Sequence, residues 1–293
     1  MKTYKDIVGD GGSDVVGQVT EHAARVQARM ASVKRIVAVM SGKGGVGKSS
    51  VTVNLASAFA MQGKTVGVLD ADINGPSVAR MIGAQDQALR RNGNGVFPAT
   101  GFADIKVMST DLFLQSDDAP VLWDAPTQKD AFTWRGMMEA VALREFVADT
   151  VWGELDYLLI DLPPGSDKLP NIADILPRLS GVVVVTLPTA VSQFVVGKSI
   201  SMAKQLLQTP ILGIVENMSA YICAKCGEQK TLFSSGGVDE LAEKFETSIL
   251  GKIPFDPHIA LAADSGEGFL EANADSVAAK EILRIANCIK SLV

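Results

Sequence analysis

The chain has 293 residues, 47% of them hydrophobic, and a formal net charge of -6 at pH 7, which is ample apolar content for one large domain or two small ones. The acidic balance and the lack of any lysine or arginine run argue against nucleic acid as a partner. The apolar stretches are too short to span a bilayer, no secretory signal is present, and three cysteines do not make a disulfide framework, so we expect a cytoplasmic protein without a membrane partner.

Residues 1–33 are expected to form a mobile segment or a short helix ahead of the main domain. The first 13 residues are polar and rich in glycine, which is typical of a mobile chain end. From Asp14 to Met30, apolar residues recur at roughly helical spacing and predict an amphipathic helix. Residues 34–293 are interpreted as a single domain.

The stretch from Ile36 to Asn54 organises the rest of the chain. Ile36–Met40 are apolar and rich in β-branched residues, which favours a strand buried on both faces. Gly42–Ser49 follow the pattern G-x-x-x-x-G-K-S, and apolar residues recur at helical spacing from Val51 onward. A strand, a glycine-rich loop and a helix in this order predict a phosphate-binding P-loop.

This loop supplies what a polyphosphate, a dense anion, requires. Residues without a Cβ let the backbone curl so that several N–H groups converge on the phosphates. The N-terminus of the helix adds partial positive charge, Lys48 adds a full charge, and the Ser49 hydroxyl can bind a magnesium ion. The residues expected to bind the nucleotide are Gly42, Lys43, Gly44, Gly45, Val46, Gly47, Lys48, Ser49 and Ser50.

Acidic residues follow a second predicted buried strand, Thr65–Leu69. Asp70 and Asp72 come directly after it. Ligands of open α/β sheets bind at such strand ends, where these carboxylates would orient magnesium-bound water and the attacking water. The alternative is a helix cap or a turn, which the following Asn, Gly and Pro also favour.

Another buried strand, Tyr157–Ile160, ends at Asp161 and continues into Pro163-Pro164-Gly165. This pattern is similar to a Walker B strand. Asp161 would hold magnesium through water, and the turn would sense the γ-phosphate through a backbone N–H. An acid at a strand end is common by chance, but an acid followed by Pro-Pro-Gly after a P-loop is not.

The remaining elements complete an α/β pattern. Strands are predicted at Ile105–Met108, Gly181–Leu187, Ile211–Ser219 and Ser248–Ile253, and helices near 132–149, 193–207, 238–245 and 275–293. Together they predict a three-layer P-loop NTPase with a mostly parallel central sheet flanked by helices.

The last helix carries Ile282, Ile285, Ala286, Ile289 and Leu292 on one face. We expect this stripe to pack on the sheet, with a membrane-targeting tail as the alternative. Cys288 lies next to the stripe and is expected to be a buried thiol.

The predicted strand Ile211–Ser219 ends in polar residues, and a cysteine pair follows it in a loop. Asn217 could contact an adenine edge, since its amide both donates and accepts; a turn or cap is the alternative. Cys223 and Cys226 have the C-x-x-C spacing of ligands to one soft metal centre, and a redox pair or half of a zinc site are the other readings. A complete site needs about four ligands, so the simplest complement is a second copy of the chain related by a two-fold axis. The loop near 219–237 is therefore interpreted as an insertion that carries the metal.

These segments together resemble the Mrp/ApbC family of iron–sulfur carrier ATPases, which is related to the nitrogenase iron protein and to the MinD/ParA ATPases. The resemblance covers about residues 34–290. It rests on the P-loop, on Glu216–Ser219 with the cysteine pair, and on Asp70–Ser77, Trp134–Gly136, Trp152–Tyr157, Asp161–Gly165 and Gly251–Pro257. The P-loop alone indicates only the wider deviant Walker A superfamily, whereas Glu-Asn-Met-Ser followed by C-x-x-C is the discriminating piece.

The resemblance implies a role for each matching residue. Lys43 looks like the lysine of deviant Walker A ATPases that reaches the phosphates of the other subunit, where a cation would stabilise transition-state charge. The other implied roles are phosphate contact for Lys48, magnesium binding for Ser49, positioning of the attacking water for Asp72, the switch II acid for Asp161, adenine contact for Asn217, and a 4Fe-4S cluster bridging two subunits for Cys223 and Cys226.

The chain departs from the family pattern at three places. Ser166-Asp167-Lys168 stand where the family usually has Thr-Gly-Asp, Met137 replaces a proline, and Leu187-Pro188-Thr189 replaces Thr-Pro-Gln. The nucleotide and cysteine motifs are intact. These differences bear on the hydrolysis rate and on client identity more than on binding of ATP or of the cluster.

The sequence therefore predicts an ATP-hydrolysing homodimer that carries a 4Fe-4S cluster to apoprotein clients. A MinD/ParA-like positioning ATPase that switches its association with a surface, without a cluster, is the alternative from a different class. A zinc-bridged dimeric ATPase is the third reading.

Overall fold

The buried strands form one sheet in the computed structural model, which describes residues 15–113, 128–165, 168–176, 178–207, 209–223, 225–233 and 238–293. Along the path β9-β8-β1-β7-β2-β6 all neighbours are parallel, and β11 also pairs parallel with β9. In the described part of this sheet, antiparallel pairing is confined to β10 on β9 and β5 on β6. The prediction of a mostly parallel sheet is confirmed. The strands of the sheet are β1 (Val33–Ser41), β2 (Val66–Asp70), β5 (Ala99–Thr100), β6 (Lys106–Met108), β7 (Leu155–Asp161), β8 (Gly181–Thr186), β9 (Ile211–Ile222), β10 (Gln229–Lys230) and β11 (Ile249–Phe255).

Both faces of the sheet are covered, which explains why apolar residues stand at consecutive positions in the middle of its central strands. In β1, Val37 and Val39 belong to one buried cluster, whereas Ile36, Ala38 and Met40 belong to the cluster on the opposite face. Successive side chains of a strand point to opposite faces, so a strand with helices on both sides needs apolar residues throughout.

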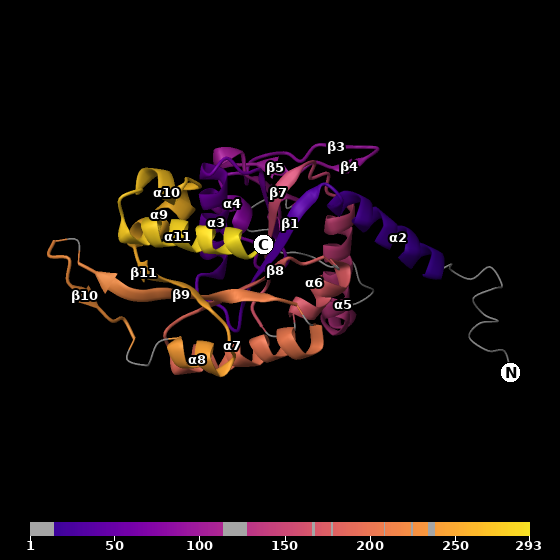
Figure 1. Ribbon diagram of the computed structural model, residues 1–293. Coiled ribbons are helices and arrows are strands. Elements are labelled where there is room, and N and C mark those ends of the chain that lie inside the picture. Colours follow the sequence, from indigo (N-terminus) through magenta and orange to yellow (C-terminus); the bar gives the residue numbers. More distant parts are fainter. Residues whose placement is uncertain are drawn as a thin grey trace.

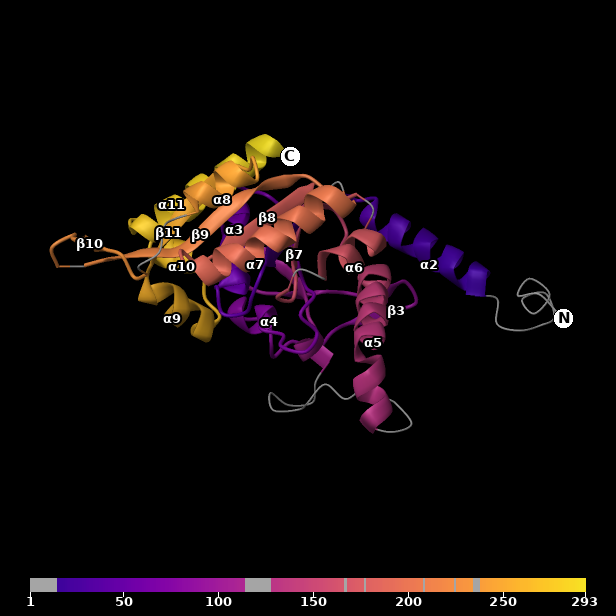
Figure 2. The same cartoon turned by 90° about the horizontal axis from the view of Figure 1, so that it is seen from below.

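Helices form the two outer layers (Figures 1 and 2). One layer contains α3 (Lys48–Met61), α4 (Val78–Met81), α9 (Pro257–Ser265), α10 (Phe269–Ala272) and α11 (Val277–Leu292). The other contains α2 (Val15–Met30), α5 (Gln128–Asp149), α6 (Lys168–Ile175), α7 (Ala190–Met202) and α8 (Asp239–Lys244). Short elements outside these layers are the hairpin of β3 (Arg91–Asn92) and β4 (Gly95–Val96), the 3-10 turns η1 (Phe102–Asp104) and η2 (Thr110–Phe113), and the π-helical turn η3 (Ala203–Leu207) that ends α7.

The termini of the described chain differ in part from expectation. The predicted N-terminal helix is present as α2, and its Val26 is buried against the sheet layer, whereas residues 1–14 lie outside the described part. The apolar stripe of α11 packs on the core as predicted, except that Leu292 is 54% exposed. The prediction of a buried Cys288 is wrong: its thiol is half-buried, and the Arg284 guanidinium lies 3.8 Å from it.

The greatest difference lies in β9. The predicted strand ended at Ser219 with the cysteine pair in a loop beyond it, but β9 continues to Ile222 and turns back into β10, so the pair lies in a β-hairpin that projects from the body of the sheet (Figure 1). The polar residues Glu216 and Asn217 therefore lie inside a strand instead of at its end. In the described ranges, no helix is both long and apolar enough to cross a membrane.

Candidate nucleotide site

The predicted P-loop connects β1 to α3. Gly45 and Gly47 have φ values of 75° and 79°, a left-handed conformation that glycine adopts without a Cβ penalty. Gly47 is the residue before the first turn of α3, so the loop leads directly into the helix N-terminus. The loop is closed further by the Ser41 hydroxyl, which donates to the Lys43 carbonyl at 3.0 Å.

A pocket of about 240 Å³ lies over this loop. Eight of the nine residues predicted to bind nucleotide line it, whereas Gly42 is buried beneath the loop. A Cβ on Gly42 would lie 2.8 Å from the backbone nitrogen of Val196, so α7 packs directly against the start of the loop. The lining residues are Ser41, Lys43, Gly44, Gly45, Val46, Gly47, Lys48, Ser49, Ser50, Asp72, Met81 and Pro164.

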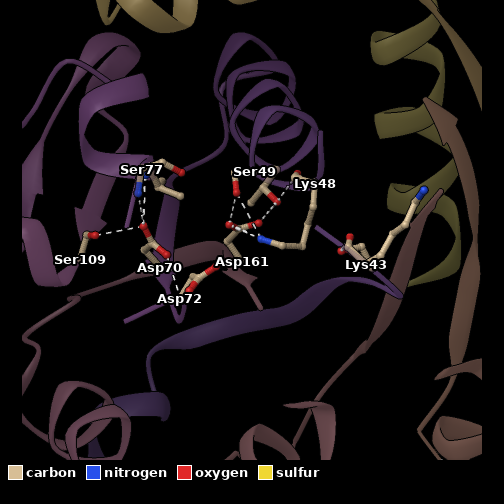
Figure 3. Close-up of polar contacts among 11 residues, drawn as sticks. Lys43, Lys48, Ser49, Asp70, Asp72, Ser77, Ser109 and Asp161 are labelled. Atoms are coloured by element: carbon tan, nitrogen blue, oxygen red, sulfur yellow. Dashed lines mark hydrogen bonds and ion pairs between the residues drawn. The ribbon is translucent and has the colours of Figure 1, made fainter. Parts of the chain in front are cut away.

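Asp161, at the end of β7, accepts hydrogen bonds from polar side chains of the P-loop helix α3 (Figure 3). The Lys48 ammonium lies 2.5 Å from its Oδ2 atom, and the Ser49 hydroxyl donates to the same oxygen at 2.6 Å. The Thr52 hydroxyl donates to Oδ1 at 2.7 Å. Both the carboxylate and Thr52 are buried. The predicted nucleotide residues Lys48, Ser49 and Asp161 are thus brought together by hydrogen bonds.

Thr52 is a site residue that the sequence analysis did not single out. A polar residue four positions after Lys48 in a helix lies on the same face one turn further on. This spacing from Lys48 is the sequence signal that would have identified it.

Asp70 and Asp72 have different environments, although both follow β2. Asp72 is half-buried and lines the pocket, and desolvation is the main cause that raises the pKa of its carboxyl. Asp70 is fully buried; desolvation and then the neighbouring Asp161 raise its pKa to about 7. Its carboxylate accepts backbone N–H groups at the start of α4, so the turn-and-cap alternative describes Asp70. Of the two acids only Asp72 lines the pocket, and its contact with bound water stays a prediction.

The Pro-Pro-Gly turn lies against the P-loop, and its sensing of the γ-phosphate stays a prediction. The backbone N–H of Gly165 donates to the Ser41 carbonyl at 3.1 Å, and Pro164 contributes to the pocket wall. Ser166 and Asp167, where the chain departs from the family pattern, lie outside the described residues, and so does the side chain of Lys168.

Asn217 packs behind the P-loop. Its Nδ2 atom donates to the Val46 carbonyl at 2.9 Å, and a Cβ on Gly47 would lie only 2.2 Å from it. The Asn217 side chain is 6% exposed, and its hydrogen bond holds the P-loop in place. Its contact with adenine stays a prediction. The preceding Glu216 points to the opposite face of β9, where its Oε2 atom accepts the Val238 N–H at 2.9 Å.

The side chain of Lys43 has a different orientation from that of Lys48, the other cation of the P-loop. The Lys43 side chain is half-exposed and extends away from Asp161 and Lys48 (Figure 3). It forms no ion pair with any residue that the structure describes. Its predicted reach toward another subunit stays a prediction.

The two cysteines are close together in the β9–β10 hairpin and far along the chain from the P-loop. Cys223 is half-buried and Cys226 is exposed, and both are free thiols. The hairpin turn is closed by the Gly227 N–H donating to the Cys223 carbonyl at 2.8 Å. Backbone N–H groups of Cys226 and then Lys225 lower the pKa of the Cys223 thiol, which favours the thiolate that binds metals. Among the described residues, no group of three or more His, Cys, Asp or Glu side chains could hold a metal ion.

The site consists of a glycine-rich loop between β1 and α3, with a lysine and a serine bonded to the carboxylate at the end of the neighbouring strand β7. This arrangement defines a P-loop NTPase. The sequence model of the ParA family, described as "NUBPL iron-transfer P-loop NTPase", matches residues 32–290. The chain therefore belongs to the ParA family.

Relatives and solved structures agree with this assignment. The iron-sulfur cluster carrier protein of Saccharolobus solfataricus is 42% identical over 277 residues, which cover 94% of this chain and 90% of that protein. The cytosolic Fe-S cluster assembly factor CFD1 of Yarrowia lipolytica is 43% identical, over 83% of this chain and 81% of its own. The nucleotide-binding protein of Archaeoglobus fulgidus, solved in complex with ADP, is 37% identical with a TM-score of 0.71, covering 84% of this chain and 92% of that chain.

Proposed function

We propose that this protein is an ATP-dependent carrier of a 4Fe-4S cluster, which it holds between two copies of the chain and transfers to apoproteins. The observation that carries the proposal is the pair of free cysteines in the turn that directly follows β9, the strand whose Asn217 also holds the P-loop. The names of the relatives, an iron-sulfur cluster carrier and a cytosolic assembly factor, support this cargo and a cytoplasmic location.

The nucleotide in this proposal is ATP with Mg²⁺. The Ser49 hydroxyl and the carboxylates of Asp161 and Asp72 are hard oxygen donors beside the phosphate loop, which is the donor type that Mg²⁺ prefers. Bound Mg²⁺ would neutralise phosphate charge. Lys48 would contact the phosphates, Asn217 the adenine, and Asp72 would position the attacking water. Hydrolysis is proposed to be slow, since the family's usual residues after the Pro-Pro-Gly turn are replaced.

The homodimer is supported by two separate features. The cysteine pair provides two thiolates where a cluster takes about four, and a two-fold axis supplies the second pair without further residues. Lys43 extends from the P-loop away from its own acidic cluster, as a cation serving a neighbouring subunit would (Figure 3). Both features call for the same second copy.

Anaerobic reconstitution tests the proposal. The purified chain is incubated with iron and sulfide, and bound iron, sulfide and the electronic spectrum are measured together with the molar mass. We expect about four iron and four sulfide per dimer. The double variant Cys223→Ala, Cys226→Ala should lose the cluster, whereas the matched control Cys288→Ala, which alters the third free cysteine, should keep it.

Each competing reading has its own result in this experiment. A double variant that retains the full cluster would refute the cluster site. Zinc without sulfide in anaerobically purified protein would identify a zinc-bridged ATPase. ATP-dependent binding to liposomes or DNA that is indifferent to loss of both cysteines would identify a positioning ATPase.

A further inference from the structure

The carboxylate of Asp70 is the centre of a buried hydrogen-bonded cluster beside the nucleotide site (Figure 3). Its Oδ2 atom accepts the backbone N–H groups of Ser77 at 3.0 Å and Val78 at 3.1 Å, and the Ser109 hydroxyl at 3.0 Å. Its Oδ1 atom accepts the backbone N–H of Asp72 at 3.1 Å. Asp70 is 1% exposed, so these four donors take the place of water around the carboxylate.

These donors fix both ends of one loop. Residues 72–77 leave the end of β2 and return to the start of α4. Asp70 holds the first residue of this loop through the Asp72 N–H and the last through the Ser77 N–H. Within the loop, the Gly75 N–H donates to the Asp72 carbonyl at 3.2 Å and closes a turn. The path of the loop therefore depends on one carboxylate.

The segment after β6 supports the same loop. The fully buried Ser109 donates to Asp70, and the neighbouring Thr110 hydroxyl donates to the Ile73 carbonyl at 3.1 Å. Because β6 is paired with β2, these contacts connect the loop to the rigid part of the sheet.

The chemistry of the cluster requires a carboxylate. All four partners are donors, and a carboxylate is acceptor-only, whereas an amide would direct its own N–H₂ group at one of them. The arrangement also has an energetic cost. Burial removes water from the Asp70 carboxylate, and the neighbouring Asp161 adds charge repulsion, so both desolvation and repulsion disfavour the charged form of Asp70. Buried carboxylates held at such a cost are found preferentially at functional sites.

We infer that Asp70 is a positioning residue for nucleotide hydrolysis, which holds the loop 72–77 so that the Asp72 carboxylate faces the P-loop. The inference rests on the proposed role of Asp72 in hydrolysis. Asp72 is the one carboxylate among the described residues that line the pocket, and Asp70 does not line it. Asp70 thus acts through Asp72, and a displacement of Asp72 by about 1 Å would slow hydrolysis about 100-fold.

The test compares variants of the full chain: Asp70→Asn, Asp72→Asn and the control Asp156→Asn. Asp156 is a suitable control because it also accepts a backbone N–H and a hydroxyl, both from Thr65. It lies near the start of β7, whereas Asp161 and the nucleotide site lie at the end of that strand. The measurements are the single-turnover rate of hydrolysis at saturating Mg-ATP, the affinity for a fluorescent ATP analogue, and the thermal unfolding midpoint.

We expect Asp70→Asn to slow hydrolysis about 10- to 100-fold while nucleotide affinity stays within about threefold of wild type. Asp72→Asn should slow it at least as much. Asp156→Asn should lower the unfolding midpoint and leave the rate within about twofold.

Four results would decide against the inference. It is overturned if Asp70→Asn keeps the wild-type rate while Asp72→Asn does not, or if Asp156→Asn slows hydrolysis to the same extent at equal stability. If Asp72→Asn itself keeps the rate, the proposed role of Asp72 fails first, and the inference fails with it. If Asp70→Asn does not fold, Ser109→Ala decides instead, since it removes one hydrogen-bond donor to Asp70 and leaves three. A hydrolysis rate lowered about threefold at unchanged nucleotide affinity supports the inference. An unchanged rate overturns it.

Discussion

Replacing Thr52 with valine tests how strongly the P-loop helix is bound to Asp161. Valine has the shape of threonine and a similar helix propensity, so the substitution removes the hydroxyl without opening a cavity. The lost hydrogen bond is 2.7 Å long, and both partners are buried. A hydrogen bond to a charged group contributes about 1.5–3 kcal/mol, and the buried Oδ1 atom of Asp161 would lose this donor. We expect the free energy of unfolding to fall by about 2 kcal/mol.

The same substitution at Thr65 provides the control. The Thr65 hydroxyl also donates to an aspartate, Asp156, at 3.2 Å, but Thr65 is exposed and water can replace it. Thr65→Val should therefore cost about 0.5 kcal/mol or less. Both variants are measured by urea denaturation without nucleotide. Equal losses of stability, or a loss below about 0.5 kcal/mol for Thr52→Val, would refute the argument that burial makes the Thr52 hydrogen bond strong.

Three further predictions concern the P-loop and the opposite end of the sheet. Gly47→Ala places a Cβ at φ 79° and 2.2 Å from the Asn217 Nδ2 atom, so titration with a fluorescent nucleotide should show about a tenfold loss of affinity; affinity within twofold of wild type would contradict the steric argument. The pKa of Asp156 is lowered to about 2, chiefly by its hydrogen bond from Lys34, so this carboxylate stabilises the fold above its ordinary pKa of 3.8. Since Lys34 is exposed, the contribution is about 1 kcal/mol; it should be lost as the pH falls from about 4 to 2, and urea titrations of Asp156→Asn should lack this pH dependence. Lys43→Ala should slow ATP hydrolysis without weakening nucleotide binding to a single chain, because Lys43 extends away from Asp161; a matching loss of binding would show that it contacts phosphates in its own chain.

Much of the sheet and of the P-loop could be predicted because the responsible interactions are local or periodic. Ile36–Met40 are apolar at every position, which only a strand covered on both faces requires. The glycines with positive φ and the Lys48-Ser49 pair lie within one short loop, so their spacing carries the geometry.

The features that could not be predicted depend on contacts between distant parts of the chain. The polar pair Glu216 and Asn217 has the composition of a strand end, but their partners, Val238 and Val46, are remote in the sequence and satisfy them inside β9. Similarly, nothing near Asp70 in the sequence shows that Ser109 completes its set of donors. Composition alone therefore could not separate a pocket acid from a structural one.

The path of β9 has a mechanical consequence. Asn217 is fixed to the P-loop, and the first cysteine follows six residues later. The strand bulges in between, since Met218 has a φ of 52° and the step from Asn217 to Tyr221 lies against only two residues of β11, so the two ends are about 13 Å apart. Pairing with β11 at Asn217 and again at Tyr221 holds this segment to the sheet. A rotation of the segment by about 10° at Asn217 would move the cysteine end by about 2 Å. That distance is comparable to a metal–sulfur bond, so a movement of the phosphate loop too small to alter the fold is large enough to change the spacing of the thiolates across the proposed dimer.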